Sequence, residues 1–206
     1  MSKAQTKAPS RRRLDPAVRR VQILEEMLRL CANQHFASIS MRQLAAACDV
    51  NMALLYHYFD SKQGLVRAAL RHAIDDFLVE FDDLPKDVEA PLGAADVWIE
   101  ATIDAAPRLT RMVKLMSDYS SHDGQDAQAM AIIDEFYMRE RDTLRHAILD
   151  GMAQGRFRRV DAERTARLTS MAIDGVFFGG PARNDHNYAR NLRDLRDQLL
   201  DYLQPA

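Results

Sequence analysis

Polar side chains at the starts of short helical segments could bind a polyanion. Ser40 and Asn51 each stand where a side-chain oxygen can accept a hydrogen bond from the first turn of a helix. Arg42 and Lys62 lie close to helix starts, where backbone N–H groups attract phosphate. A lysine at a helix start opposes the helix dipole, which favours a phosphate ligand for Lys62 over an ordinary solvated position. This arrangement predicts contacts to a phosphate backbone.

No pattern typical of an enzyme accompanies these residues. The sequence contains no Gly-x-Ser-x-Gly, no His-Glu-x-x-His, no glycine-rich phosphate loop and no paired cysteines. Its six histidines are scattered, and Cys31 and Cys48 lie in apolar helical patterns that predict small buried side chains. We therefore expect no catalytic residues, no cofactor and no metal site.

Composition and charge define the broad class. Hydrophobic residues make up 47% and charged residues 28% of the 206 positions, which is typical of a folded globular protein. Residues 1–72 hold 12 Lys and Arg against 5 Asp and Glu, whereas the rest of the chain holds 16 against 25. This asymmetry favours a basic N-terminal module for a polyanion, although five of the basic residues precede the first expected helix.

Hydropathy gives no reason to expect a membrane protein. No apolar stretch approaches the ~20 residues needed to cross a bilayer. The basic N-terminal stretch has no apolar segment behind it, so no secretory signal is expected and the predicted location is the cytoplasm.

The helical periodicity predicts an all-α fold without strands. Asp15 and Pro16 are typical of a helix start, and Ser40 and Asn51 begin two short helices around a tight turn at residues 48–50. This outline predicts a helix-turn-helix. The expected helices span about 16–33, 41–47, 52–57, 62–81, 95–106, 107–119, 127–154, 161–178 and 187–203, with the Gly-Gly-Pro of 179–181 ending the eighth.

The segment from Ser40 to Leu65 resembles the DNA-binding segment of tetracycline-repressor (TetR) family regulators. Its Leu55-Tyr56, Phe59 and Ser61-Lys62 fall at the family's intervals, and the resemblance extends over about residues 16–77. It implies a homodimer of all-helical subunits with about nine helices each. It also implies three parts: a flexible basic arm (1–15), a helix-turn-helix DNA-binding domain (16–77, motif about 40–59) and a ligand-binding and dimerisation domain (78–206).

Two departures from the family pattern bear on the backbone and on the phosphate contact. His35 and Asp49 stand at chain reversals where the family usually has Gly, and both residue types tolerate positive φ. The family's order of aromatic and histidine residues is reversed at His57 and Tyr58. Either ring is therefore a candidate for the phosphate contact.

A recognition helix enters the major groove with its N-terminal residues facing the bases. We expect Asn51, Met52, Leu55 and Tyr56 on the exposed face and Leu54 packed inward, with Asn51 capping the helix, contacting a base, or both. The basic arm either reaches the minor groove or backbone or only solubilises the chain. The predicted DNA-binding residues are Arg11, Arg12, Arg13, Ser40, Arg42, Asn51, Met52, Ala53, Leu55, Tyr56, His57, Tyr58 and Lys62.

The C-terminal helices carry the predicted dimer interface and effector pocket. The last helix has a heptad-like apolar seam, which pairs with a partner subunit or packs on its own core. The predicted interface residues are Leu168, Ala172, Gly175, Tyr188, Leu192, Leu195, Leu199 and Tyr202. Large side chains on the central helices either line a pocket or form ordinary core: Trp98, Met112, Met116, Tyr119, Phe136, Tyr137 and Phe177. Asp174 is among the polar candidates beside them.

The sequence thus predicts a dimeric regulator of transcription that binds a double-stranded DNA operator. We expect a repressor that a partly apolar small-molecule effector releases from a palindromic operator. A ligand-independent helix-turn-helix factor controlled by a protein partner, or an activator, is the alternative.

Overall fold

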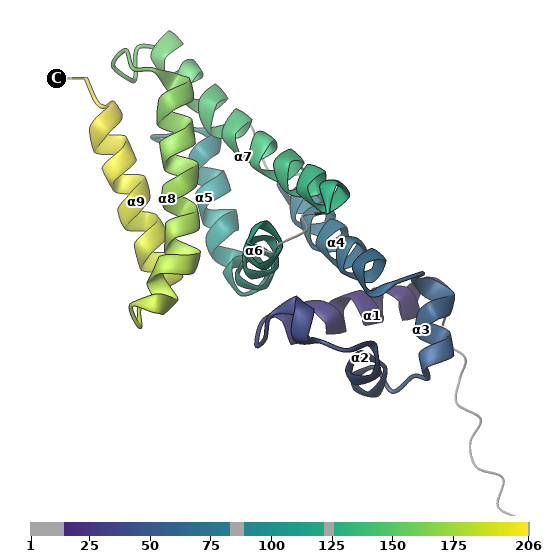
Figure 1. Cartoon of the computed structure of the whole chain (residues 1–206). Helices are drawn as coiled ribbons and strands as arrows, with labels where there is room; N and C mark the ends of the chain where they lie inside the picture. The colour runs from purple at the N-terminus through teal and green to yellow at the C-terminus, as the bar shows by residue number, and fades with distance from the viewer. Residues whose placement is uncertain (1–14, 83–88, 122–125, 206) are drawn as a thin grey trace, which may run out of the picture.

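The computed structural model describes residues 15–82, 89–121 and 126–205, and in these ranges the chain is all-helical, with nine α-helices and one short 3-10 helix. Figure 1 shows the helices in chain order. They are α1 (Pro16–Cys31), η1 (Phe36–Ser38), α2 (Met41–Ala47), α3 (Met52–Tyr58), α4 (Lys62–Asp82), α5 (Ala94–Asp104), α6 (Ala106–Ser120), α7 (Ala127–Ala153), α8 (Ala162–Ala182) and α9 (Tyr188–Leu203).

Local signals set most of the helix ends. Asp15 caps α1 by accepting a hydrogen bond from the Ala17 N–H at 2.8 Å, and Pro16 occupies the first turn. At the far end of α7, Gly155 takes a φ of 70°, which reverses the chain at low steric cost. These ends agree with the sequence predictions.

One predicted helix end is different in the structure. Helix α8 continues through Gly180 and Pro181 to Ala182 instead of ending at residue 178. Gly180 is buried against the Asp185 carbonyl, where an added Cβ would lie 2.7 Å from the oxygen, so tertiary packing holds this last turn. Helix α4 runs continuously past residue 77, so the predicted domain boundary falls inside a helix.

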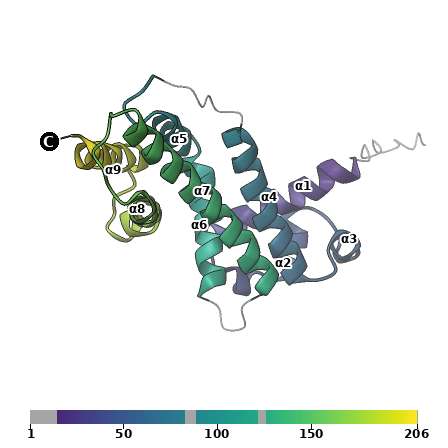
Figure 2. The same ribbon diagram turned by 90° about the horizontal axis from the view of Figure 1, so that it is seen from above.

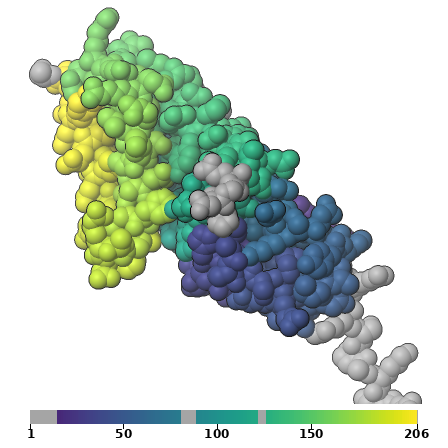
Figure 3. All heavy atoms as spheres, in the orientation of Figure 1, coloured from purple at the N-terminus to yellow at the C-terminus, as the bar shows by residue number. Residues whose placement is uncertain are grey.

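The helices form two groups that share one buried core. Helices α1–α3 lie at one end of the molecule, and α8 and α9 lie at the other end (Figures 1 and 2). Helices α4, α6 and α7 connect them, since α4 packs against α1, α6 and α7. The space-filling view shows the N-terminal helices and the α8–α9 pair at opposite ends of the molecule (Figure 3).

No helix among the described residues combines the length and the apolar character needed to span a bilayer.

Candidate nucleic-acid interface

Helices α2 and α3 each begin with a capping side chain. The Ser40 Oγ accepts from the Gln43 N–H at 3.1 Å, and the Asn51 Oδ1 accepts from the Leu54 N–H at 2.8 Å. Each cap satisfies a backbone donor that the helix itself leaves unpaired. Both residues are exposed, so the N-terminal ends of α2 and α3 are accessible to solvent.

The turn between the two helices depends on a left-handed residue. Asp49 has a φ of 51°, and the Val50 N–H donates to the Ala45 carbonyl at 2.9 Å. A short polar side chain tolerates this conformation where the family usually has Gly. His35, the second such position, instead has a φ of −60°, and its Nδ1 accepts from the Ala37 N–H at 3.1 Å to cap η1.

Helix α3 presents a narrow exposed face. Ala53, Tyr56 and His57 are exposed, whereas the Met52 and Tyr58 side chains are half-buried and pack against the core. Tyr56 is the large apolar residue on this face, with half of its surface exposed. The face therefore offers one aromatic ring, one imidazole and small apolar groups.

The prediction for two adjacent leucines is wrong. Leu55 is fully buried and cannot reach a base edge, whereas Leu54 is half-exposed. Leu55 lies four residues before the buried Phe59 and therefore on the same side of the helix, which faces the core. Leu55 is a packing residue that anchors α3.

Two predicted phosphate contacts lie on the helices that precede and follow α3 in the chain. Arg42 is exposed on the first turn of α2. The Lys62 Nζ donates to the Ala37 carbonyl at 2.6 Å, and burial lowers the pKa of its ammonium. Lys62 thus links η1 to the start of α4. Its ammonium group has two further N–H groups that can donate hydrogen bonds. The predicted contacts of Arg11, Arg12 and Arg13 lie outside the described residues.

The predicted dimer residues divide between the core and the surface. Leu192 and Leu199 are buried within their own subunit, so their assignment to an interface is wrong. The seam of α9 packs on α5 and α8 of the same chain, and Tyr188 stacks on Phe177 with centroids 5.4 Å apart. Ala172 and Leu195 are half-buried, and Tyr202 is half-exposed beneath the Arg158 guanidinium, 4.2 Å from its ring centroid.

Helix α8 carries the exposed apolar stripe instead. Leu168, Met171 and Phe178 are exposed, and an added Cβ at Gly175 would meet no heavy atom within 4 Å. Their spacing of 3, 4 and 3 residues places all four on one face of the helix. Met171 and Phe178 were not predicted, although this spacing is visible in the sequence.

The predicted pocket residues lie inside the fold. Trp98, Met112, Met116, Tyr119, Phe136 and Phe177 are buried, and Tyr137 is half-buried. Buried side chains of this kind can either form the core or line a pocket, so their burial is consistent with both predictions. A hollow of about 440 Å³ opens elsewhere, beside α1, and Glu25, Arg29, Cys48 and Arg111 are among its lining residues.

Two acidic side chains lie between α7 and α8, beside Tyr137: Glu140 is buried and Asp174 is half-buried. The Tyr137 hydroxyl donates to the Asp174 Oδ2 at 2.8 Å, and the Ser170 hydroxyl donates to the Glu140 Oε2. Burial raises the pKa of the Glu140 carboxyl to about 8 and also raises the pKa of Asp174. Glu140 and Ser170 were not predicted, because an acid in a helix of mixed polarity resembles a solvated one.

Together, these elements define a class: a helical DNA-binding protein whose helix-turn-helix is built onto a larger helical body. Residues 23–69 match the family described as bacterial regulatory proteins, tetR family. Residues 23–69 are therefore a DNA-binding segment of the TetR-family type, as found in bacterial transcriptional regulators. No curated protein matches the sequence.

Solved structures share the fold over nearly the whole chain. A TetR-family transcriptional regulator from Agrobacterium tumefaciens is 18% identical, with coverage of 93% of this chain and 100% of that chain and a TM-score of 0.77. Salmonella enterica GusR is 26% identical, with coverage of 92% and 97% and a TM-score of 0.66. A protein from Saccharomonospora viridis in complex with choline is 20% identical, with coverage of 92% and 100% and a TM-score of 0.75.

Proposed function

We propose that this protein is a homodimeric repressor that binds a palindromic operator and is released by a small-molecule effector. The exposed face of α3, with Asn51 at its cap and Tyr56 at its centre, is the observation that carries the proposal. A helix held by its buried side and open on the other suits insertion into a major groove. Residues 16–82 then form the DNA-binding part and the remaining helices the regulatory part.

The exposed stripe of α8 supports the dimer. Leu168, Met171, Gly175 and Phe178 leave apolar surface in water on a helix at the end of the molecule opposite α3. Two copies paired there by a two-fold axis would each offer one α3 to the operator. Recognition helices must lie one duplex turn apart, roughly 34–36 Å, to read two half-sites.

The effector proposal rests on the helical body around α7. The choline complex of the Saccharomonospora viridis protein shows that this fold holds a small organic molecule in that protein. In this chain the buried Glu140 and the half-buried Asp174 add acidic groups to a largely apolar interior. A partly apolar compound that favours a different spacing of the two α3 helices would release the operator.

A selection of random DNA fragments by the purified protein tests the proposal. We expect an enriched palindrome, and we expect Tyr56→Ala to weaken its binding at least tenfold without loss of folding. Arg42→Ala should reduce the slope of log affinity against log salt by about 0.9, as expected for one lost phosphate contact. Arg159→Ala, at another exposed arginine, after α7, is the matched control and should leave the slope unchanged.

Four outcomes would contradict parts of the proposal. Failure to enrich any DNA at low salt would contradict the proposed DNA interface. Enrichment of a single half-site without symmetry would contradict the proposed dimer. Operator binding that no compound of a broad panel changes would favour control by a protein partner, and increased transcription in the presence of the protein would identify an activator.

A further inference from the structure

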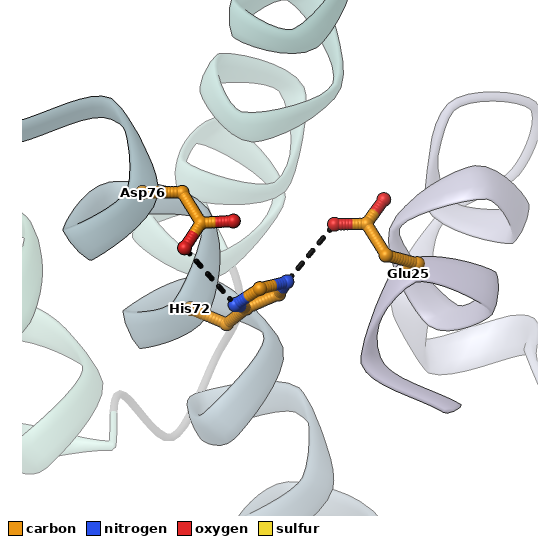
Figure 4. A group of neighbouring side chains, drawn as sticks. All are labelled: Glu25, His72 and Asp76. Carbon is orange, nitrogen blue, oxygen red and sulfur yellow. Dashed lines mark hydrogen bonds and ion pairs between the residues drawn. The ribbon is translucent and has the colours of Figure 1, made fainter. Parts of the chain in front are cut away.

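Three side chains from α1 and α4 lie close together between these two helices. Glu25 of α1 faces His72 of α4, and Asp76 lies one turn further along α4 (Figure 4). The His72 Nε2 is 2.9 Å from the Glu25 Oε1, and the His72 Nδ1 is 3.5 Å from the Asp76 Oδ1. One donor atom from each residue can be chosen so that all three lie within 4.8 Å of one another.

The three side chains differ in their freedom to move. The His72 side chain is only 15% exposed, so packing holds its ring between the helices, whereas Glu25 and Asp76 are 46% and 56% exposed. The imidazole is therefore a fixed donor, and the two carboxylates can turn without any shift of the backbone. Solvent reaches the cluster from the carboxylate side, so an ion needs no entry path through the core.

One imidazole and two carboxylates are a common ligand set for first-row divalent metals. Zinc bonds to nitrogen and carboxylate oxygen at about 2.0–2.2 Å, so its donor atoms lie roughly 3–3.5 Å apart. Glu25 faces the Nε2 of His72 and Asp76 faces its Nδ1, so an ion would take one ring nitrogen and the carboxylate on the other side would have to rotate toward it. Water can complete the coordination.

We propose that Glu25, His72 and Asp76 bind one divalent transition-metal cation, with Zn²⁺ as the preferred ion, and that the ion fastens α1 to α4. The inference goes beyond the proposed function and is independent of it, because DNA takes no part in the site. Glu25 and His72 stand 47 positions apart and no short motif joins them, so the sequence pattern predicts no metal site.

Arg111 of α6 bears on the affinity of this site. Its Nη1 lies 3.9 Å from the Glu25 Oε2, the oxygen that does not face His72. The guanidinium repels a cation and competes with it for Glu25. Removal of this positive charge should therefore strengthen metal binding, whereas a site made elsewhere in the chain would not respond.

Titration of the full-length, chelator-stripped protein with Zn²⁺ tests the proposal. We expect one ion per chain by calorimetry and a higher unfolding temperature in its presence. Glu25→Gln, His72→Gln and Asp76→Asn should each weaken binding by at least about tenfold, and Arg111→Gln should tighten it severalfold. Mg²⁺ should bind far more weakly, because it prefers an all-oxygen octahedral shell.

Matched variants separate this site from other donors. Asp75→Asn changes the neighbouring carboxylate, which pairs with Arg71 at 3.6 Å, and His146→Gln changes an exposed histidine of α7. Both should bind Zn²⁺ as the unchanged protein does. Co²⁺ should give d–d absorption without a thiolate charge-transfer band, and this spectrum should be lost in His72→Gln.

Circular dichroism and metal-free melting establish that each variant is folded before titration. Absence of Zn²⁺ binding at micromolar to millimolar concentrations would overturn the proposal. Binding that persists in all three ligand variants, or that is lost instead in Cys48→Ser, would also overturn it. Unchanged affinity in Arg111→Gln would contradict the role of Glu25.

Discussion

The ring of Tyr119 on α6 stacks on the ring of Phe36 on η1, with centroids 4.5 Å apart and planes inclined by 9°. Phe36 lies just before the helix-turn-helix, so this contact joins the DNA-binding part directly to the helical body. Near it, the Arg67 Nη1 of α4 pairs with the Asp126 Oδ2 at the start of α7 at 2.5 Å. A change in the position of α6 or α7 would therefore act on both ends of the segment that carries α2 and α3.

The buried Tyr119 hydroxyl gives the first prediction. Among the described residues it has no hydrogen-bond partner, and burial raises its pKa to about 12. An unpaired buried hydroxyl costs about 1–3 kcal/mol, so Tyr119→Phe should raise the free energy of unfolding by about 1 kcal/mol in urea titrations. Tyr202→Phe, on an exposed ring, should change it little. A lower stability in Tyr119→Phe would show that the hydroxyl has a partner in solution.

The second prediction is a pH dependence caused by Glu140. Its pKa is about 8 in the folded chain and about 4.5 ordinarily, so between these values the folded state holds a proton that the unfolded state has lost. The free energy of unfolding should therefore fall as pH rises from about 4.5 to about 8, by a few kcal/mol at about 1.4 kcal/mol per pKa unit.

Glu140→Gln should remove most of this fall, and the variant should be more stable than the unchanged protein at pH 9. Part of the fall should remain, because burial raises the pKa of Asp174 as well. Glu135→Gln, an exposed acid of the same helix, is the control. Equal pH profiles for Glu140→Gln and the unchanged protein, measured by denaturant unfolding, would refute the assignment.

The third prediction concerns the stripe of α8. Met171 exposes 62% of its surface, and a charge there would have to be desolvated in an apolar interface. Met171→Asp should therefore convert a dimer to monomers at micromolar concentration in sedimentation velocity. Met138→Asp changes a similarly exposed methionine of α7 and should leave the dimer intact. If Met171→Asp also stays dimeric, the interface lies on another surface.

The fourth prediction separates the structural and the DNA-binding roles of Lys62. Its ammonium donates to the Ala37 carbonyl at 2.6 Å, and hydrogen bonds to charged groups contribute about 1.5–3 kcal/mol. Lys62→Gln should lower the free energy of unfolding by about 1–2 kcal/mol. Because two N–H donors remain for phosphate, the salt slope of operator binding should also fall by about 0.9.

These two effects of Lys62→Gln are measured separately, by denaturant unfolding and by fluorescence anisotropy over a salt series. Gln63→Ala, at the next and exposed position, should change neither quantity. An unchanged salt slope would leave Lys62 with a structural role only, and an unchanged stability would exclude the contribution of its carbonyl contact.

Short-range chemistry made much of the fold predictable. Ser40 and Asn51 cap their helices with partners three residues away, so the starts of α2 and α3 follow from the local sequence. The spacing of Leu55, Tyr56 and Phe59 resembles that of the TetR-family DNA-binding segment, and this resemblance indicates the helix-turn-helix. These features depend on residues within one or two helical turns of each other, and sequence spacing describes such neighbours well.

Only the tertiary structure decided which way adjacent or ambiguous residues face. A seven-residue helix with Leu54 and Leu55 side by side does not specify its inward leucine, and packing buried Leu55. The seam of α9 fits its own core as well as a partner subunit, and the neighbouring helices took Leu192 and Leu199 into the core. Glu25 and His72 meet only because α1 packs on α4. Burial and long-range contact arise from the whole chain's packing, whereas caps and helix periods are encoded residue by residue.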